Sequence, residues 1–232
     1  MNKPILTVIG DGGHSRVIRD IIQKQNTYQL GGVLDDKTED RKEIDGVYYG
    51  RISDYAFLTK KFPEVYFFVA VGDNRVRANI VNRLAIDHNQ FAALIHPSAL
   101  ISPTSEIGPG TVVMPGSIIN ANTKIGSHCI VNSGSIIEHD NHIQNFVHVS
   151  PNATLTGGVT IRAGAHIGAS ATIIPNRTVG EWAIIGAGSV VIHDIEKHTK
   201  AAGNPARYLL KDKKENCHEK KNIFVTSSHE RE

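Results

Sequence analysis

The sequence predicts an α/β domain followed by an all-β domain that winds into a parallel β-helix. The main observation is a six-residue period of branched aliphatic residues that begins at residue 95. Before that point, apolar runs alternate with segments of helical spacing, which is the pattern of a parallel sheet with covering helices. The composition agrees, because 21 glycines with only 6% aromatic residues suit thin, repetitive packing better than a bulky core.

The period continues without interruption over seventeen positions, all of which are Ile, Val or Leu. They are Ile95, Ile101, Ile107, Val113, Ile119, Ile125, Val131, Ile137, Ile143, Val149, Leu155, Ile161, Ile167, Ile173, Val179, Ile185 and Val191. With aliphatic residues at about a quarter of positions, chance would give this series on the order of once in ten thousand million trials. Such a repeat takes precedence over local propensity in predicting the fold.

A six-residue period fits neither the helical repeat nor plain two-residue alternation. It fits short strands joined by tight corners, with one inward aliphatic side chain per side and three sides per triangular coil. Small residues stand four positions after ten of the aliphatic ones, at Thr111, Ser117, Thr123, Cys129, Ser135, Ala153, Ala165, Ala171, Ala183 and Ser189. Corners are supplied by turn residues, as at Pro109-Gly110. We expect a prism roughly 25 Å long, at ~4.8 Å per coil.

The N-terminal part predicts a small parallel sheet of Rossmann-like type. In chain order we expect a strand over 5–9, a helix carrying Val17, Ile18, Ile21 and Ile22, a strand ending at 32–34, an apolar strand over 65–71, a helix carrying Val76, Ile80, Val81 and Leu84, and a final short strand over 91–95. The predicted organisation is therefore a Rossmann-like domain over 1–92, a β-helix over 93–196, and a segment over 197–210 that leaves the repeat from Ala201 onward. A disordered tail over 211–232 completes the chain.

Charge and composition exclude several classes of function. A formal net charge of +2 with no long basic block gives no electrostatic footprint for nucleic acid. No apolar run is long enough for a membrane span, and the first ten residues do not resemble a signal peptide. Cys129 and Cys217 lack the paired spacing of a zinc site or a disulfide framework. These features predict a cytoplasmic protein, in which Cys129 is a core thiol.

Three motifs follow the predicted strands of the N-terminal domain. They are the glycine loop Gly12-Gly13-His14, the carboxylate pair Asp35-Asp36, and Gly72 with its neighbours Asp73 and Asn74. The carboxyl ends of parallel strands meet at one edge of the sheet, and the N–H groups at a helix start can hold a diphosphate. The loop is not a full dinucleotide fingerprint, because Ser15 stands where Gly or Ala is needed. We therefore predict a nucleotide-sugar pocket rather than an NAD site.

Histidines inside the repeat suggest two kinds of chemistry. His139 follows the inward Ile137 by two residues, so it lies near a coil edge, and the adjacent Asp140 can hold its tautomer as in a general base. His148 and His166 are one full coil apart and should stack in one column. Together with His142 they leave open a metal site of the γ-carbonic-anhydrase kind.

Several of these motifs resemble the sugar O/N-acetyltransferases of the sialic-acid and bacillosamine pathways, a NeuD/PglD-like family of hexapeptide-repeat enzymes. They are Gly12-Gly13-His14, Ile136 to Asp140, Val147 to Ser150, and Gly203 to Ala206. The resemblance covers residues 4 to about 210. It implies a left-handed parallel β-helix and a homotrimer. It also implies acetyl-CoA in a groove between neighbouring prisms and a nucleotide sugar on the N-terminal domain.

The resemblance also assigns roles to individual residues. His139 would be the general base and Asp140 its orienting group, where the bacillosamine enzymes have Glu. Gly157 would offer a backbone N–H to the oxyanion, and Asn132 would help to position the reactants. The acetyl-CoA contacts would be His148, Ala169 and Ala187. The nucleotide-sugar contacts would be Gly12, Gly13, His14, Asp35, Asp36 and Gly72, and no metal is expected.

The leading interpretation is an acetyl-CoA-dependent N-acetyltransferase acting on a UDP-linked 4-amino-4,6-dideoxy sugar for surface glycan biosynthesis. Transfer would be direct, with a histidine base. A GDP-perosamine N-acetyltransferase or a sialic-acid O-acetyltransferase are the close alternatives. A γ-carbonic-anhydrase-like metal enzyme and a non-catalytic trimeric scaffold are the distant ones. For a trimer, Phe146, Val147 and Val149 are expected to provide surface that a neighbouring subunit covers.

Overall fold

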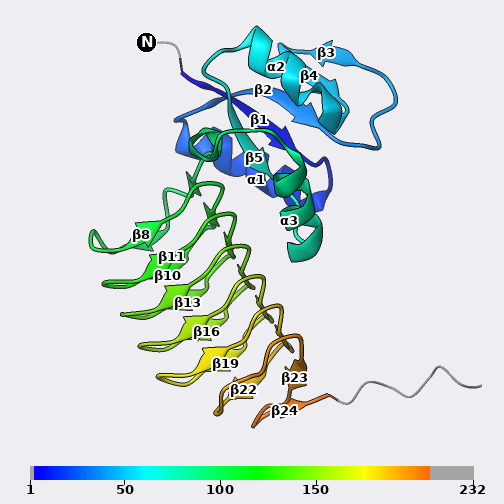
Figure 1. The fold of residues 1–232 in the computed structure, drawn as a ribbon. Helices are drawn as coiled ribbons and strands as arrows, with labels where there is room; N and C mark the ends of the chain where they lie inside the picture. Colours follow the sequence, from blue (N-terminus) through cyan, green and yellow to red (C-terminus); the bar gives the residue numbers. More distant parts are fainter. Residues whose placement is uncertain (1–2, 210–232) are drawn as a thin grey trace, which may run out of the picture.

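A computed structural model describes residues 3–209, which form an α/β unit standing on one end of a triangular β-prism (Figure 1). The predicted tail over 211–232 lies outside the described residues. Among those described, no helix has the length and apolarity that a membrane crossing requires.

The α/β unit contains one five-stranded sheet with the order β3-β4-β2-β1-β5. Its strands are β1 (Ile5–Ile9), β2 (Gln29–Leu34), β3 (Lys42–Ile44), β4 (Val47–Gly50) and β5 (Tyr66–Val69). Its helices are α1 (Gly13–Gln25), α2 (Tyr55–Lys61) and α3 (Asn74–Arg83), with short 3-10 helices η1 (Ile52–Asp54) and η2 (His88–Gln90). The parallel strands β2, β1 and β5 lie side by side, so the motifs that follow them meet at one edge.

The β3–β4 hairpin and α2 are additions that the sequence analysis did not include. All three residues of β3 are exposed, so this strand has no apolar run to indicate it. The signal that was available is the turn Asp45-Gly46, whose φ angles of 50° and 76° are those of a two-residue hairpin turn.

The prism has three faces, numbered here in chain order. Face 1 is built from β6 (Leu94–Ile95), β9 (Val112–Val113), β12 (Ile130–Val131), β15 (His148–Val149), β18 (His166–Ile167), β21 (Ile184–Ile185), β23 (Lys200–Ala202) and β24 (Arg207–Tyr208). Face 2 is built from β7 (Leu100–Ile101), β10 (Ile118–Ile119), β13 (Ile136–Ile137), β16 (Thr154–Leu155), β19 (Thr172–Ile173) and β22 (Val190–Val191). Face 3 is built from β8 (Glu106–Ile107), β11 (Lys124–Ile125), β14 (His142–Ile143), β17 (Thr160–Ile161) and β20 (Thr178–Val179).

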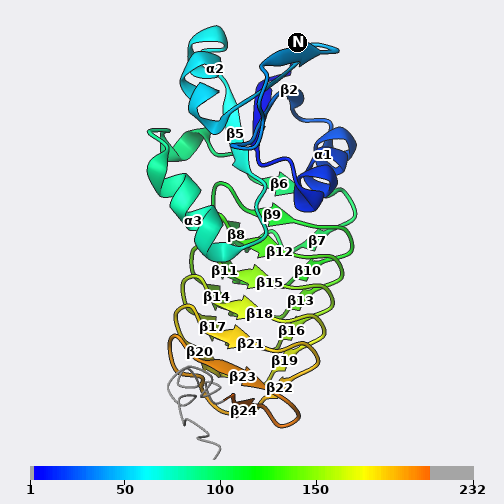
Figure 2. The same ribbon diagram turned by 90° about the vertical axis from the view of Figure 1, so that its right-hand side faces the viewer.

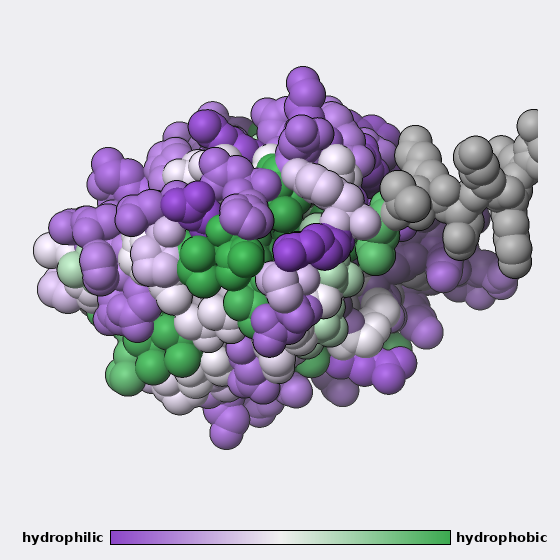
Figure 3. All heavy atoms as spheres, turned by 90° about the horizontal axis from the view of Figure 1, so that it is seen from below, coloured by the Kyte–Doolittle hydropathy of each residue, from purple (hydrophilic) through white to green (hydrophobic). Residues whose placement is uncertain are grey.

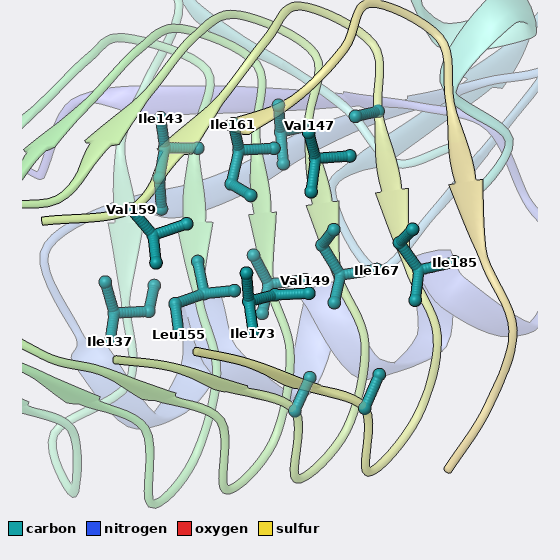
Figure 4. Close-up of a cluster of buried hydrophobic side chains, with 14 of the residues drawn as sticks. Ile137, Ile143, Val147, Val149, Leu155, Val159, Ile161, Ile167, Ile173 and Ile185 are labelled. Atoms are coloured by element: carbon teal, nitrogen blue, oxygen red, sulfur yellow. The ribbon is translucent and has the colours of Figure 1, made fainter. Parts of the chain in front are cut away.

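The predicted interior is confirmed. All seventeen periodic aliphatic residues lie in or against one continuous cluster, with only Ile95, Ile101 and Ile107 partly exposed at the upper end. Figure 4 shows part of this cluster, including Ile137, Leu155 and Ile173. The ten small residues are at most 1% exposed. Successive coils pair in parallel with an offset of eighteen residues, for example Ile119 with Ile137, so each inward side chain packs on its counterpart in the next coil.

The corners repeat as regularly as the interior. A residue with φ between 54° and 71° recurs every six positions. These residues are Gly110, Gly116, Asn122, His128, Gly134, Asp140, Phe146, Asn152, Gly158, Gly164, Ser170, Asn176, Trp182 and Gly188. Asn, Asp and His enter this left-handed region more readily than other non-glycine residues do. The chain can therefore place functional side chains at corners without giving up the coil.

Two sequence predictions about the ends of the prism need correction. The segment 91–95 is not a full strand of the N-terminal sheet, because only Phe91 bridges to Phe67, and β6 pairs with β9 of the prism. The prism also continues beyond the predicted end of its repeat, because β23 extends the parallel ladder of face 1 as far as Ala201. The end of the prism near this strand has an apolar area framed by polar side chains (Figure 3).

The predicted subunit surface at Phe146, Val147 and Val149 is wrong. Val147 and Val149 are 0% exposed and point into the prism (Figure 4). Phe146 is half-buried at a corner, where its ring stacks on that of His128 with 5.2 Å between centroids. The sequence position of Phe146 in the six-residue frame resembles that of a surface residue, but α3 packs beside this corner (Figure 2).

The α/β unit is fixed to face 1 by an apolar core. Ile18 and Ile21 of α1 pack with Leu94, Val112 and Ile130, which occupy the outer side of the first coils of face 1. Further down the same column the outward residues become His148 and His166. The lower edge of the α/β unit therefore faces two histidines of the prism.

Candidate active site

The corner between faces 2 and 3 carries a histidine–carboxylate pair. Nδ1 of His139 lies 2.7 Å from Oδ2 of Asp140, and both side chains are more than half exposed. The hydrogen bond from His139, followed by that from Asn122, holds the pKa of Asp140 below its usual value. Because an ionised carboxylate only accepts hydrogen bonds, Nδ1 carries the proton and Nε2 is left as the basic atom. Glu138 takes no part, because it accepts a hydrogen bond from Asn120 instead.

Gly157 lies one coil below, directly under the imidazole of His139. A Cβ atom at this position would stand 2.7 Å from Cε1 and 2.8 Å from Nε2 of His139, so any side chain here would displace the ring. The main chain is held close by the hydrogen bond from Gly158 N–H to the His139 carbonyl, at 3.0 Å. Within residues 3–209 the Gly157 N–H donates to no acceptor. It is therefore available beside the imidazole of His139.

Substitution of Asp140 by asparagine tests the carboxylate at this corner. The φ angle of 59° at position 140 suits Asn as well as Asp, so Asp140→Asn should keep the turn and remove only the charge. We expect turnover in the assay described below to fall at least about tenfold, because the imidazole loses the group that fixes its tautomer. Unchanged turnover with an unchanged melting temperature would contradict the orienting role of Asp140.

His148 and His166 stack as predicted, on the outer side of face 1. Their ring centroids are 4.7 Å apart. Nε2 of His148 lies 3.1 Å from the amide nitrogen of Asn132, and Nε2 of His166 lies 2.9 Å from the Ser150 hydroxyl. Burial, followed by the nearby His166, Arg77 and His14, lowers the pKa of His148 to about 3. The structure thus brings His148 and Asn132 together on face 1, on a different side of the prism from His139.

The metal alternative lacks its third ligand. His142 lies on the outer side of face 3, whereas His148 and His166 lie on face 1. Over residues 3–209 no group of three His, Cys, Asp or Glu side chains is placed to hold a metal ion.

Ala169 and Ala187 share a column at the corner between faces 1 and 2. Ala187 is exposed and Ala169 is half-buried, and Gly188 N–H donates to the Ala169 carbonyl at 2.8 Å. They follow His139 by 30 and 48 residues, which at eighteen residues and ~4.8 Å per coil puts them about 8 and 13 Å further along the prism. In one chain these alanines and His139 therefore occupy two different corners, both of which flank face 2.

The strand-end motifs of the α/β unit do meet at one edge of its sheet. Space is open around the two glycines of the loop and around Gly72, since a Cβ atom at any of them would meet nothing within 4 Å. Both oxygens of Asp35 accept backbone N–H groups, from Asp11 at 2.8 Å and Lys37 at 2.9 Å, so this side chain shapes the loop. Asp36 pairs with Arg83 at 3.1 Å on the surface.

Two buried residues on α3 join the α/β unit to the prism. The sequence analysis missed Arg77 and named Asn74 only as a neighbour of Gly72 at the strand end. Arg77 is 1% exposed, and its guanidinium reaches carbonyl groups of both the α/β unit and the prism. Asn74 donates to Gly164 and Ala165 of the prism, at 3.1 Å each. An arginine in a helix usually indicates a solvated face, so no sequence signal distinguished Arg77 from its neighbour Arg75.

The buried histidines predict that the protein is destabilised by mild acid. Burial is the main cause that lowers the pKa of His14 and His128 to about 4 and that of His148 to about 3. Between pH 6.5 and 4 the unfolded chain therefore binds up to three more protons than the folded one, so the free energy of unfolding falls as pH falls. Denaturant unfolding at pH 7 and pH 5 should show this loss. An unfolding free energy that is the same at pH 7 and pH 5 would contradict the burial of these rings.

Comparison with known proteins identifies the family. The model of the PglD N-terminal domain matches residues 5–84, and that of the bacterial transferase hexapeptide, with six repeats, matches residues 104–139. The acetyltransferase domain of PglB from Neisseria gonorrhoeae FA1090, in complex with acetyl coenzyme A, is 34% identical with a TM-score of 0.79, covering 90% of this chain and 100% of that one. The chain belongs to the hexapeptide-repeat acetyltransferases with a PglD-type N-terminal domain.

Two further relatives of this PglD-type protein bear on its activity. A histidine-to-asparagine mutant of perosamine N-acetyltransferase from Caulobacter crescentus, in complex with CoA and GDP-perosamine, is 30% identical with a TM-score of 0.81, covering 90% of this chain and 97% of that one. UDP-N-acetylbacillosamine N-acetyltransferase of Bacillus subtilis is 44% identical over 107 residues, or 46% of this chain and 50% of the relative. That alignment spans only half the length of the curated relative.

Family membership confirms the predicted resemblance and the predicted fold class, a Rossmann-like domain followed by a left-handed parallel β-helix. The handedness could not come from the period alone, because the six-residue repeat fits either hand and the usual preference for crossovers is right-handed.

Proposed function

We propose that this protein transfers the acetyl group of acetyl-CoA to the amino group of a nucleotide-linked sugar. The observation that carries the proposal is the exposed His139–Asp140 pair above the free N–H of Gly157. A base with a fixed tautomer and an oxyanion donor are the two groups that acyl transfer to an amine needs. The relatives that bind acetyl-CoA, or CoA with GDP-perosamine, support the same reaction.

The transfer is direct. The sugar amine attacks the thioester carbonyl, and Nε2 of His139 accepts a proton from the nitrogen as the new C–N bond forms. The Gly157 N–H donates to the oxyanion of the tetrahedral intermediate. When the C–S bond breaks, the CoA thiolate leaves and the imidazolium returns the proton to it. No covalent enzyme intermediate is required, because the two substrates meet in one groove.

The N-terminal domain, residues 1–92, is proposed to hold the nucleotide. The N–H groups of Gly12 and Gly13 at the start of α1 suit the diphosphate, and Asp36 and Gly72 lie on the adjacent strand ends. Because His148 continues the outer column of face 1 on which the α/β unit packs, we propose that His148 lines the sugar side of the site rather than the acetyl-CoA side. Asn132 then acts by holding the His148 ring.

The oligomer proposed is a homotrimer in which face 2 of each prism points toward the threefold axis. A closed ring of this kind brings the corner with His139 of one chain against the corner with Ala169 and Ala187 of the next. Acetyl-CoA would lie in that groove. The outer side of face 2 carries the apolar column Leu100, Ile118 and Ile136, which replaces the surface predicted from the sequence. Light scattering should give three times the chain mass of 25.3 kDa, whereas a monomer would contradict the shared site.

The acceptor proposed first is a UDP-linked 4-amino-4,6-dideoxy sugar for surface glycan synthesis, which the Bacillus subtilis relative supports. GDP-perosamine is the second candidate, supported by the Caulobacter crescentus structures. Both substrates and acetyl-CoA point to a cytoplasmic location.

The deciding experiment incubates the protein with acetyl-CoA and, in turn, UDP-linked amino sugars, GDP-perosamine and a sialic acid, while free thiol release is followed. We expect thiol release that depends on an amino-sugar nucleotide and gives an N-acetylated product. Release with sialic acid alone would favour O-acetylation instead. No release with any acceptor would contradict the proposed function.

A further inference from the structure

The corner between faces 3 and 1 presents backbone carbonyls that the coil itself does not use. In successive coils the N–H groups of His128, Phe146 and Gly164 donate to the coil above. The carbonyls of these three residues accept no backbone N–H within the part of the chain that the structure describes. At an exposed corner water would satisfy them. Here α3 covers the corner (Figure 2), and a buried carbonyl without a partner is costly.

Arg77 and Asn74 of α3 supply the missing donors. Arg77 donates from Nε to the His128 carbonyl at 2.8 Å and from Nη2 to the Phe146 carbonyl at 3.1 Å. Asn74 donates to the Gly164 carbonyl at 3.1 Å. One helix turn therefore contacts three successive coils of one corner.

The same guanidinium also holds the loop that precedes α3. Its Nη1 donates to the carbonyls of Val71 at 2.8 Å and Gly72 at 3.2 Å, and its second Nη2 proton goes to Oδ1 of Asn74 at 2.7 Å. All five N–H groups of Arg77 are thus engaged, and no carboxylate is among the acceptors. A lysine has only three donors on one nitrogen and cannot reproduce this fork.

We propose that Arg77 and Asn74 form a clamp that sets the position of the Gly72 loop, and with it the acceptor pocket, relative to the prism. They are positioning residues, and the proposal rests on the acetyltransferase function proposed above. The acceptor pocket belongs to the α/β unit, whereas the acetyl-CoA groove belongs to the prism corners. A looser clamp therefore misplaces the amine relative to the thioester and leaves the cofactor groove as it is.

The test compares Arg77→Lys with Arg75→Met in steady-state kinetics. Arg75 lies two residues earlier on α3, with its guanidinium 4.6 Å from the centroid of the Trp182 ring, and among the described residues its side chain donates to no carbonyl. We expect Arg77→Lys to lower kcat/KM for the amino-sugar nucleotide at least about tenfold, with KM for acetyl-CoA within about twofold of wild type. Arg75→Met should change neither of these two constants by more than about twofold. Asn74→Ala should also lower kcat/KM for the amino-sugar nucleotide, by a smaller factor than Arg77→Lys does.

Hydrogen exchange of amides 71–74 in the full-length protein gives a readout that does not depend on activity. We expect these amides to exchange at least about tenfold faster in Arg77→Lys than in wild type, while amides 130–149 of the prism interior keep their rates. Wild-type exchange rates together with unchanged acceptor kinetics would overturn the clamp. A general acceleration across the prism would also overturn it, because Arg77 would then be needed for folding rather than for positioning. If the wild-type protein itself transfers no acetyl group, the proposed function fails, and the exchange rates still decide whether the clamp holds the loop.

Discussion

Replacing His139 by alanine is expected to lower acetyl-transfer turnover at least about a hundredfold, or about 2.7 kcal/mol of transition-state stabilisation. Nε2 of His139 is the atom proposed to accept the amine proton, because Nδ1 is engaged with Asp140. The ring contributes nothing to the buried core, so the melting temperature and acetyl-CoA binding by calorimetry should stay at wild-type values.

His142→Ala is the matched control for this prediction. His142 is likewise exposed and lies three residues further along the same coil, on face 3. It should retain full turnover. Near-normal turnover in His139→Ala would remove His139 from the role of base, and an equal loss in both variants would point to a general effect of the coil surface.

The second large effect is expected from Gly157→Ala. The new methyl group would stand within 3 Å of two ring atoms of His139, which forces the imidazole away from its place above the oxyanion donor. A displacement of about 1 Å at a reacting group can lower the rate about a hundredfold. We therefore expect a loss of that size in turnover, with little change in the unfolding free energy, because the ring moves into solvent.

A double substitution separates displacement of the base from other effects of Gly157→Ala. When His139 is already alanine, the added methyl group has no ring to move, so Gly157→Ala should lower turnover no further. Equal losses in both backgrounds would mean that Gly157 acts independently of the base.

The interior of the prism could be predicted from the sequence because one rule governs it. Each coil side needs one branched aliphatic residue, and a thin prism admits only small groups beside it, as at Ala165 and Ala171. The environment of the corner residues was harder to predict from the sequence, because it depends on which other elements pack against the outside of the coil. Phe146 has the same place in the repeat as Asp140, yet one is covered by α3 and the other faces solvent.

The candidate site likewise has features that could be predicted from the sequence and features that could not. The His139–Asp140 pair was predictable because neighbours in sequence on a tight corner are neighbours in space. The place of Gly157 under His139 follows from the eighteen-residue offset between coils. The burial of His148 and the contacts of Arg77 with the prism depend on how the α/β unit docks on face 1. That docking is set by long-range contacts such as Ile18 with Val112, which leave no periodic signal.

Subunit mixing tests the central claim most directly. His139→Ala removes the base, and Ala187→Trp blocks the proposed acetyl-CoA corner at an exposed position, so each variant alone should be almost inactive. In trimers randomly reassembled from equal amounts of both, about a quarter of the sites should combine an intact His139 from one chain with an intact Ala187 corner from the next. The account predicts that about a quarter of wild-type activity returns on mixing. Mixed trimers, verified by native mass spectrometry, that remain as inactive as the separate variants would contradict a site built from two chains.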